Sequence, residues 1–451
     1  MKKQIVKLSM LISLIAIIAL PLIATSQEEQ EWYGRPSHWR PYDKRGVNLF
    51  ETGKMDDSMA FDGLRVRLGA GFTQQFQNLK QKNNGSSNFE TTNRLYPVAP
   101  GFMTAQANLF VDVQLADGIR LNVSTYLSTR HHNEAWVKGG YIQFDKLPFK
   151  GQFWKDLMEV TTIKVGHMEI NYGDAHFRRS DGGQALYNPF MEGNIMDAFA
   201  TEIGGEIYLQ KNGLFGMVGV TNGMIKGNVD SVAKTLQDDN TNRSPSLYLK
   251  GGFDRNIGED VRIRVSGSFY HNGSSAASGL TLYGGDRSGS NYQNVMEKAP
   301  LGAANPASTA IAFSGRFNPG FTKKVDAYML NGFLKVKGVE LFGTYENAKG
   351  RSKTERSLRN MNQYAADLVY RFGQNENLYT GIRYNKVKGQ LPTMVNDIKI
   401  DRVALAAGWF VTKNVLLKGE YVMQNYYSFP SSDYRSSGKF NGYVIEAVVG
   451  F

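Results

Sequence analysis

The sequence contains no cysteine among its 451 residues. This absence excludes a disulfide framework, thiolate metal sites and a lipid anchor on an N-terminal cysteine. Long apolar runs are also scarce beyond the first residues, and the mean hydropathy is -0.37. A bundle of membrane helices, each needing about 20 apolar residues, is therefore excluded. The 48 glycines and short apolar stretches suit many short strands, each with a single apolar face.

The one long apolar run stands at the start of the chain. Three lysines precede a mostly apolar stretch over residues 8–23, which ends in the small residues of a cleavage pattern. These features are typical of a secretory signal peptide, although an uncleaved helix is the alternative. We therefore expect residues 1–26 to be removed. Residues 27–61 are polar with several aromatic side chains, and we expect a periplasmic N-terminal extension or a segment tucked into the mouth of the fold.

From residue 62 onward, apolar and polar residues alternate in segments of about ten residues, the length that a tilted strand needs to cross a bilayer. Residues 64–73, 119–127, 261–270 and 403–409 show this most clearly. Short connections made of turn residues alternate with long polar ones. The pattern predicts an all-β fold over residues 62–451, a transmembrane antiparallel β-barrel with short periplasmic turns and long outer loops. A soluble β-sandwich is the alternative.

The number of segments is odd. We count 17 of them, whereas a single-chain barrel with both ends in the periplasm needs an even number. We expect that one segment is missed or split within residues 273–336. The sequence therefore predicts 16 to 18 strands.

The chain ends on an aromatic residue that completes an alternating apolar face. Its members are Tyr443, Ile445, Ala447, Val449 and Phe451. This segment resembles the terminal strand of bacterial outer-membrane barrel proteins. The resemblance implies a location in the bacterial outer membrane, with lipid as a partner. It also implies that Tyr443, Ile445 and Phe451 form a signal for the barrel-assembly machinery.

The polar faces of the strands define the expected lumen. Guanidinium groups bind carboxylates and phosphates, and rings of basic residues bias a pore toward anions. The alternative is that these arginines pair with luminal acids and brace the wall. The residues expected to line the lumen are Arg65, Arg67, Arg120, His167, Glu169, Arg262, Arg264, Arg383 and Arg402. The inward orientation of His167 and Glu169 assumes a slip of the strand near Gly166, as at a bulge.

The connection that starts near residue 171 combines mixed charge with an apolar and aromatic run, which suits a loop folded into the lumen. By our strand count it is the third outer loop. General and phosphate-selective porins constrict their pores with this loop, and the resemblance covers the barrel pattern and this strand-loop junction. It implies a pore constriction made by Tyr172, Arg178, Arg179 and Asp181. We find no arginine run or lysine array that would assign phosphate as the solute.

The leading hypothesis is a porin-like channel for passive diffusion of small hydrophilic solutes, with a mild preference for anions and no cofactor. Association into homotrimers, as in general porins, is left open. The alternatives are a structural or adaptor barrel of an envelope or secretion complex, which a plugged mouth would favour, and an outer-membrane barrel enzyme. The six histidines are scattered, so we expect no metal site and no catalytic residues. No motif supports nucleic-acid binding, despite the formal charge of +11.

Overall fold

The structure is a computed structural model. It describes residues 39–51, 61–85, 92–103, 105–128, 136–180, 184–231, 234, 242–276, 279–285, 290–302 and 314–451. The predicted signal peptide and Asp181 lie outside the described residues. No helix of the described part is long and apolar enough to cross a membrane.

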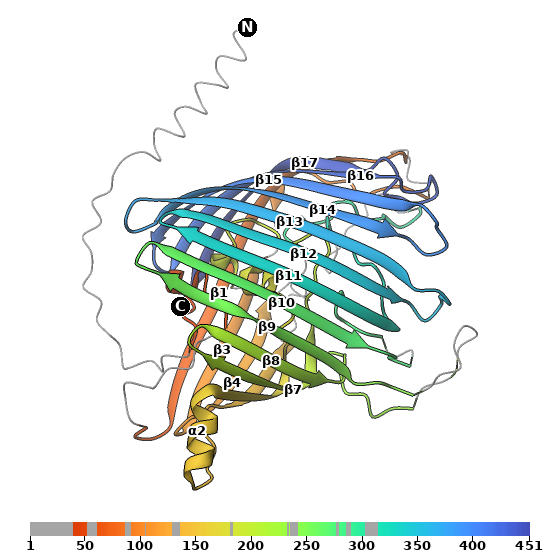
Figure 1. Ribbon diagram of the computed structural model, residues 1–451. Helices are drawn as coiled ribbons and strands as arrows, with labels where there is room; N and C mark the ends of the chain where they lie inside the picture. Colours follow the sequence, from red (N-terminus) through yellow and green to blue (C-terminus); the bar gives the residue numbers. More distant parts are fainter. Residues whose placement is uncertain are drawn as a thin grey trace.

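The described strands form one closed antiparallel sheet, a barrel (Figure 1). The sheet has 17 strands, of which β2 (Gly101–Phe102) is a two-residue piece, so 16 form the ring. Each of these pairs with its neighbour along the chain, and β17 pairs back with β1. The ring consists of β1 (Arg65–Lys82), β3 (Gln106–Ala116), β4 (Ile119–Ser128), β5 (Trp136–Phe144), β6 (Thr161–Glu169), β7 (Thr201–Lys211), β8 (Leu214–Thr221), β9 (Ser246–Ile257), β10 (Val261–Asn272), β11 (Lys324–Val336), β12 (Val339–Arg351), β13 (Arg359–Phe372), β14 (Leu378–Gln390), β15 (Asp397–Thr412), β16 (Val415–Tyr427) and β17 (Lys439–Gly450).

The predicted barrel and its range of 16 to 18 strands are confirmed, but the predicted place of the split strand is wrong. The split lies between β2 and β3. Phe102 pairs with Phe76 of β1, and β3 pairs with the part of β1 that ends at Thr73. β2 and β3 therefore lie in one line beside β1. Between β10 and β11 the described residues form no strand.

The two faces of the barrel wall differ in polarity, as the alternation predicts. Outward side chains such as Leu68, Val165 and Ile445 are 62 %, 51 % and 53 % exposed. Many of the inward ones are buried and polar, for example Glu206 and Asn385. An apolar outer face and a fully paired backbone are what a bilayer requires of a spanning sheet. The outer face and the closed sheet are therefore those of a membrane-spanning barrel.

One end of the barrel carries the short connections and the closing seam. The β7–β8 turn holds Asn212 and Gly213, both with positive φ, as a tight hairpin requires. Phe451 and Ala70 exchange backbone hydrogen bonds of 2.9 and 3.0 Å beside β17. Helix α2 (Gln152–Val160), in the β5–β6 connection, lies at this end too. We assign this end to the periplasm, because short periplasmic turns and long outer loops are the rule for such barrels.

Candidate functional site

The third outer connection runs from β6 to β7. Its described residues, 170–180 and 184–200, are called L3 below and lie across the lumen. Its backbone amides donate to side chains of the far wall. The nitrogen of Met191 donates to Glu420 over 2.8 Å, and that of Met196 donates to Gln363 over 2.8 Å. These bonds supply partners for backbone groups removed from water. L3 is thus fixed to the inner face of β13–β16.

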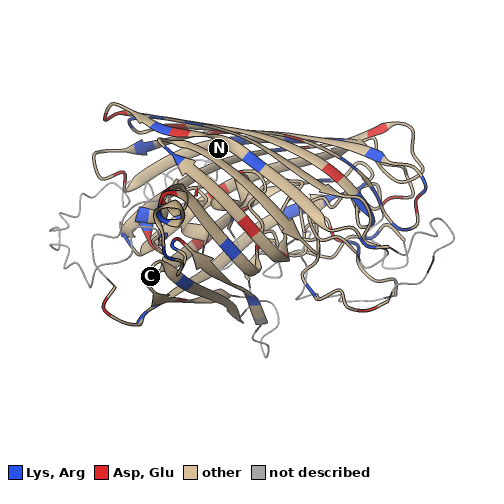
Figure 2. Cartoon of the chain, turned by 60° about the horizontal axis from the view of Figure 1, so that its bottom comes forward, with Lys and Arg blue, Asp and Glu red and all other residues tan. Residues whose placement is uncertain are grey.

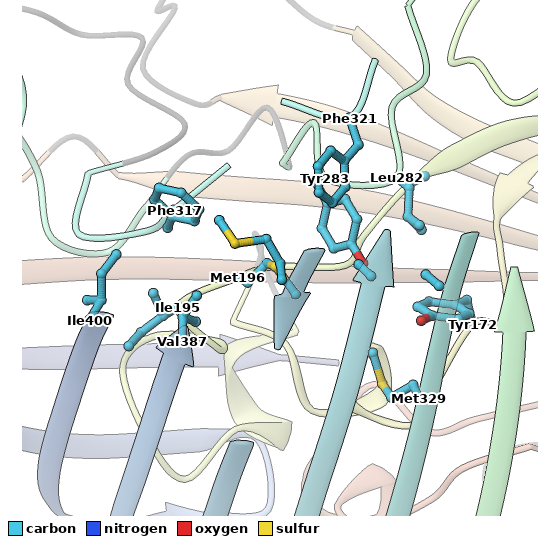
Figure 3. Close-up of a cluster of buried hydrophobic side chains, with 14 of the residues drawn as sticks. Tyr172, Ile195, Met196, Leu282, Tyr283, Phe317, Phe321, Met329, Val387 and Ile400 are labelled. Atoms are coloured by element: carbon cyan, nitrogen blue, oxygen red, sulfur yellow. The ribbon is translucent and has the colours of Figure 1, made fainter. Parts of the chain in front are cut away.

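The fifth outer connection runs from β10 to β11. Its described residues, 273–276, 279–285, 290–302 and 314–323, are called L5 below and pack on L3. Its Arg316 lies 2.6 Å from Glu192 of L3, with both side chains buried. Apolar side chains from L3, L5 and the wall fill the space between them, as Figure 3 shows. Those labelled there are Tyr172, Ile195, Met196, Leu282, Tyr283, Phe317, Phe321, Met329, Val387 and Ile400. This side of the lumen is therefore packed with side chains.

Residues 39–51, called the strap below, cross the periplasmic mouth. On one side Tyr42 stacks on Phe110 of β3 with ring centroids 4.4 Å apart. On another side the Lys44 nitrogen donates to the carbonyl of Lys413, in the β15–β16 turn, over 2.8 Å. At its end Glu51 lies 2.8 Å from Lys250 of β9. The strap therefore contacts well-separated parts of the ring and covers the mouth between them.

The strap and L3 meet at a buried ion cluster of two acids and two bases. Lys250 lies 2.8 Å from Glu51 and 2.7 Å from Asp174, and Arg264 lies 2.6 Å and 2.7 Å from the same two carboxylates. Burial opposes ionisation of both acids, but Lys250 and Arg264 lower the pKa of Glu51 to about 2 and hold that of Asp174 well below its usual value. The cluster is charged at neutral pH, and it ties strap, L3 and wall together.

The inward arginines brace the loops and the wall. Arg383 donates to Asp367 and to the carbonyl of Glu192, each over 2.6 Å. Arg402 donates to the carbonyl of Gly193 over 2.9 Å. Four more pair with acids nearby: Arg65 with Asp62, Arg67 with Asp112, Arg120 with Asp145 and Arg262 with Asp254. The bracing alternative therefore describes most of the predicted lumen-lining arginines.

The residues predicted to constrict the pore lie in different surroundings. Tyr172 lies in the packed cluster, and Arg178 lies under the Phe342 ring of β12, 3.9 Å from Glu340. Neither lines the cavity described below. Arg179 pairs with Asp197 and lies 4.0 Å from the Phe199 ring centre. The constriction itself stays a prediction.

His167 and Glu169 both line the remaining cavity. Glu169 lies 2.7 Å from Nδ1 of His176, whose other ring nitrogen lies 2.9 Å from Asn171. The expected bulge is absent, because β6 pairs with both neighbours across Gly166 without a register shift. A Cβ at Gly166 would meet the Gly140 carbonyl at 2.3 Å, which explains the glycine. The described residues contain no group of three acids or histidines that could hold a metal ion.

A cavity of about 250 Å³ remains between the strap, L3 and the inner face of β3–β7. Lys164 of β6 lines it between the rings of Tyr141 and Tyr208, whose centres lie 5.3 and 4.8 Å from its ammonium nitrogen. No carboxylate of the described residues lies within 4.0 Å of that nitrogen. Sequence reasoning missed Lys164, although its place between the outward Ile163 and Val165 turns it inward.

A second cavity of about 160 Å³ lies beside the outer connections and is lined partly by Gly284 and Ile225. Lys138 and Thr201 line both cavities. The Lys138 ammonium lies 5.3 Å from the Tyr126 ring centre and 5.7 Å from that of Phe199. The two cavities thus meet at Lys138. The sequence did not predict this residue as lumen-lining, because the register of the β4–β5 pairing shifts beside it and interrupts the alternation.

Acids and bases are interspersed along the strands, as Figure 2 shows. In the larger cavity, however, the acids are all in ion pairs, whereas one of the bases is not. The acids that line it are Glu51, Asp112 and Glu169, and the structure pairs them with Lys250, Arg67 and His176 respectively. Lys164 lies opposite Glu206 in the register but forms no ion pair with a described carboxylate, and its ammonium lies between two tyrosine rings. The cavity can therefore offer a cation to a solute more readily than an anion.

No protein-family model matches the sequence, and no curated protein does. Solved structures do resemble the fold. The anion-selective porin from Comamonas acidovorans matches with a TM-score of 0.52 at 10% identity, over 86% of this chain and 100% of that one. The outer membrane channel DcaP of Acinetobacter baumannii matches with a TM-score of 0.49 at 11% identity, over 87% and 99%. OmpT, an outer membrane protein of Vibrio cholerae, matches with a TM-score of 0.48 at 11% identity, over 87% and 99%. The chain thus has the fold of the outer-membrane porins.

Proposed function

We propose that this protein is a narrow porin-like channel for small hydrophilic solutes, with a preference for anions. The observation that carries the proposal is the pair of adjoining cavities along β3–β7, which share Lys138 and contain Lys164. The acids of the larger cavity already have basic partners. Basic side chains in a pore of low dielectric constant attract anions. We propose that solutes pass along this wall and not through the centre.

The filled lumen sets the size of the solutes. L3 and L5 occupy the side of β9–β17, where an apolar cluster of described residues fills much of the space. The strap covers the periplasmic mouth. A barrel of 16 strands would otherwise enclose a wide aqueous channel. We therefore expect a much lower conductance than the ring alone would give.

A structural or adaptor barrel is the second candidate, and the strap is the observation that favours it. A lumen closed at the periplasmic mouth suits a protein that acts through its surface. An enzyme gains no such support: Ser180 accepts a hydrogen bond from Asn188 and donates to the Phe190 carbonyl, while His176 is engaged by Glu169 and Asn171. Homotrimer formation and recognition of the terminal strand by the assembly machinery remain proposals.

Planar-bilayer recording of the purified protein tests the channel. At about 10 Å and an effective dielectric constant of about 40, one lysine stabilises an anion by ~0.8 kcal/mol. Because the same lysine disfavours a cation equally, Lys164→Gln and Lys138→Gln should each lower the anion-to-cation permeability ratio about 16-fold, measured as a shift of reversal potential in a salt gradient. Lys335→Gln is the control, because Lys335 is bound to Glu376 away from the cavities.

Unchanged reversal potentials in both variants would contradict the anion pathway. If the full chain and a chain lacking the strap both fail to conduct, the channel is refuted and the adaptor is favoured. Conductance only without the strap would keep the channel and make the strap its gate.

A further inference from the structure

The lipid-facing wall of β11–β14 has a depression. Gly332 pairs with Gly343 across β11 and β12, and Gly343 pairs with Ala366 across β12 and β13. These three outward positions therefore form a row of small residues, with neighbours about 5 Å apart. The row lies at the bottom of a groove of about 370 Å³. A Cβ built on Gly332 or Gly343 meets no atom within 4 Å, so the space is open.

Large outward side chains surround this row. Leu330, Tyr345 and Tyr364 are paired neighbours one step nearer the outer loops, and Tyr384 continues the row on β14. All four are exposed to the membrane side. The depression is thus apolar with tyrosine hydroxyls at its edge, which matches an acyl chain that enters from the headgroup region.

Lysines lie directly above the groove, toward the outer loops. Lys386 of β14 pairs with Tyr364, and on the next step Lys388 lies opposite Lys399 of β15. Like charges that face each other across two strands destabilise a sheet. Each of the two has one acid, Asp397 at 3.1 Å from Lys388 and Asp401 at 2.8 Å from Lys399.

Two further outward lysines face acids that are bound to another side chain: Asp326 lies opposite Lys349, and Asp401, which binds Lys399, lies opposite Lys386. Lys349 on β12 and Lys386 on β14 have no carboxylate within 4.0 Å among the described residues. The carboxylate that faces Lys349, that of Asp326, is bound to His271 at 2.5 Å. Both lysines stand on the half of the wall nearer the outer loops, and a phosphate is the anion that a lipid headgroup offers.

We propose that the outer face of β11–β15 binds a phosphorylated, multiply acylated lipid of the outer leaflet. Lys349 and Lys386 bind its phosphate groups, and one acyl chain occupies the groove above Gly332 and Gly343. The two lysines are spread over three strands, so they fit a headgroup that carries more than one phosphate. Lipid A, the lipid moiety of lipopolysaccharide, has such a headgroup and several acyl chains, of which the groove takes one, whereas a phospholipid has a single phosphate. This surface is independent of the lumen and of the proposed transport.

Binding of purified lipid A to the full-length protein in detergent tests the proposal. Native mass spectrometry counts bound lipid over a titration. At about 1 kcal/mol for each lysine near a charged lipid surface, replacing both lysines with glutamine should weaken binding about 30-fold. Gly332→Leu with Gly343→Leu should fill the groove and weaken binding without loss of the fold, since no atom obstructs the new Cβ atoms.

Matched controls are available on other walls. Gly216 of β8 is an outward glycine with the same open surroundings, and Lys80 of β1 is an exposed lysine of the outer half. Gly216→Leu and Lys80→Gln should leave lipid A binding unchanged. Equal binding by the wild type and both test variants would overturn the proposal. Equal affinity for phosphatidylglycerol would also overturn it, because a phospholipid would then be the occupant. A dimer that only the glycine variants abolish would overturn it too, because a second copy of the chain would then occupy the groove.

Discussion

A buried carboxylate, that of Glu51, holds the end of the strap to the wall, and its side chain is 5 % exposed. Replacing it with glutamine preserves the shape but leaves Lys250 with Asp174, and Arg264 with Asp174 and Asp254. Breaking a buried ion pair by removing one partner costs about 3 kcal/mol. If the strap detaches locally, Glu51→Gln should increase the detached fraction about 100-fold.

Limited trypsin digestion of the folded barrel measures that fraction, because Lys44 and Arg45 lie within the strap. When opening and closing are fast, cleavage follows the population of the open form. Single-channel recording should show a matching increase in open time. Asp43→Asn is the control: Asp43 pairs with Arg45 of the strap itself, whose side chain is 53 % exposed, so little should change. If Glu51→Gln resists trypsin as well as the wild type does, the ion cluster does not hold the strap.

Two further predictions concern the loops. Burial raises the pKa of Glu297, in L5, to about 7. The folded state therefore favours the protonated carboxyl group. As the pH rises from about 4.5, the usual pKa, to about 7, the packing of L5 should lose about 3 kcal/mol of stability. Hydrogen exchange of L5 should show this pH dependence in the wild type and not in Glu297→Gln. Arg178 is 3 % exposed and its guanidinium has no hydrogen-bond partner among the described residues, so Arg178→Met should leave the thermal stability unchanged or raise it. Arg371→Met, which removes the 2.6 Å partner of Glu340, should lower stability clearly; the reverse order would contradict this account.

The alternation of the strands was enough to predict the wall of the barrel. It placed Leu68 outside and Arg264 inside, because a period of two leaves only two orientations. The terminal face from Tyr443 to Phe451 predicted the closing strand, and the charge and aromatic content near residue 171 predicted an inward loop. Each of these signals is local, so it can be read without knowledge of the rest of the chain.

What fills the lumen could not be predicted in this way. The partner of Arg264 is Asp174, 90 residues away, and that of Lys250 is Glu51. Such pairs depend on which wall L3 lies against, and the sequence near each residue does not contain that information. The same holds for the function of Lys164, since a lysine on an inward face can bind an acid, pack between rings or meet a solute.

The strap also has a consequence for how the chain folds. Its residues precede all the strands, yet the Lys44 backbone bonds to Lys413, near the end of the chain. L3 likewise belongs to the first half of the sequence but is held by Glu420 and Lys418 of β16. Contacts of such wide sequence separation form late and slow the folding rate. A partly assembled sheet therefore lacks part of the surface on which the interior orders. The filled interior can be completed only once the last strands are in place, so closure and the final filling belong to a single cooperative step.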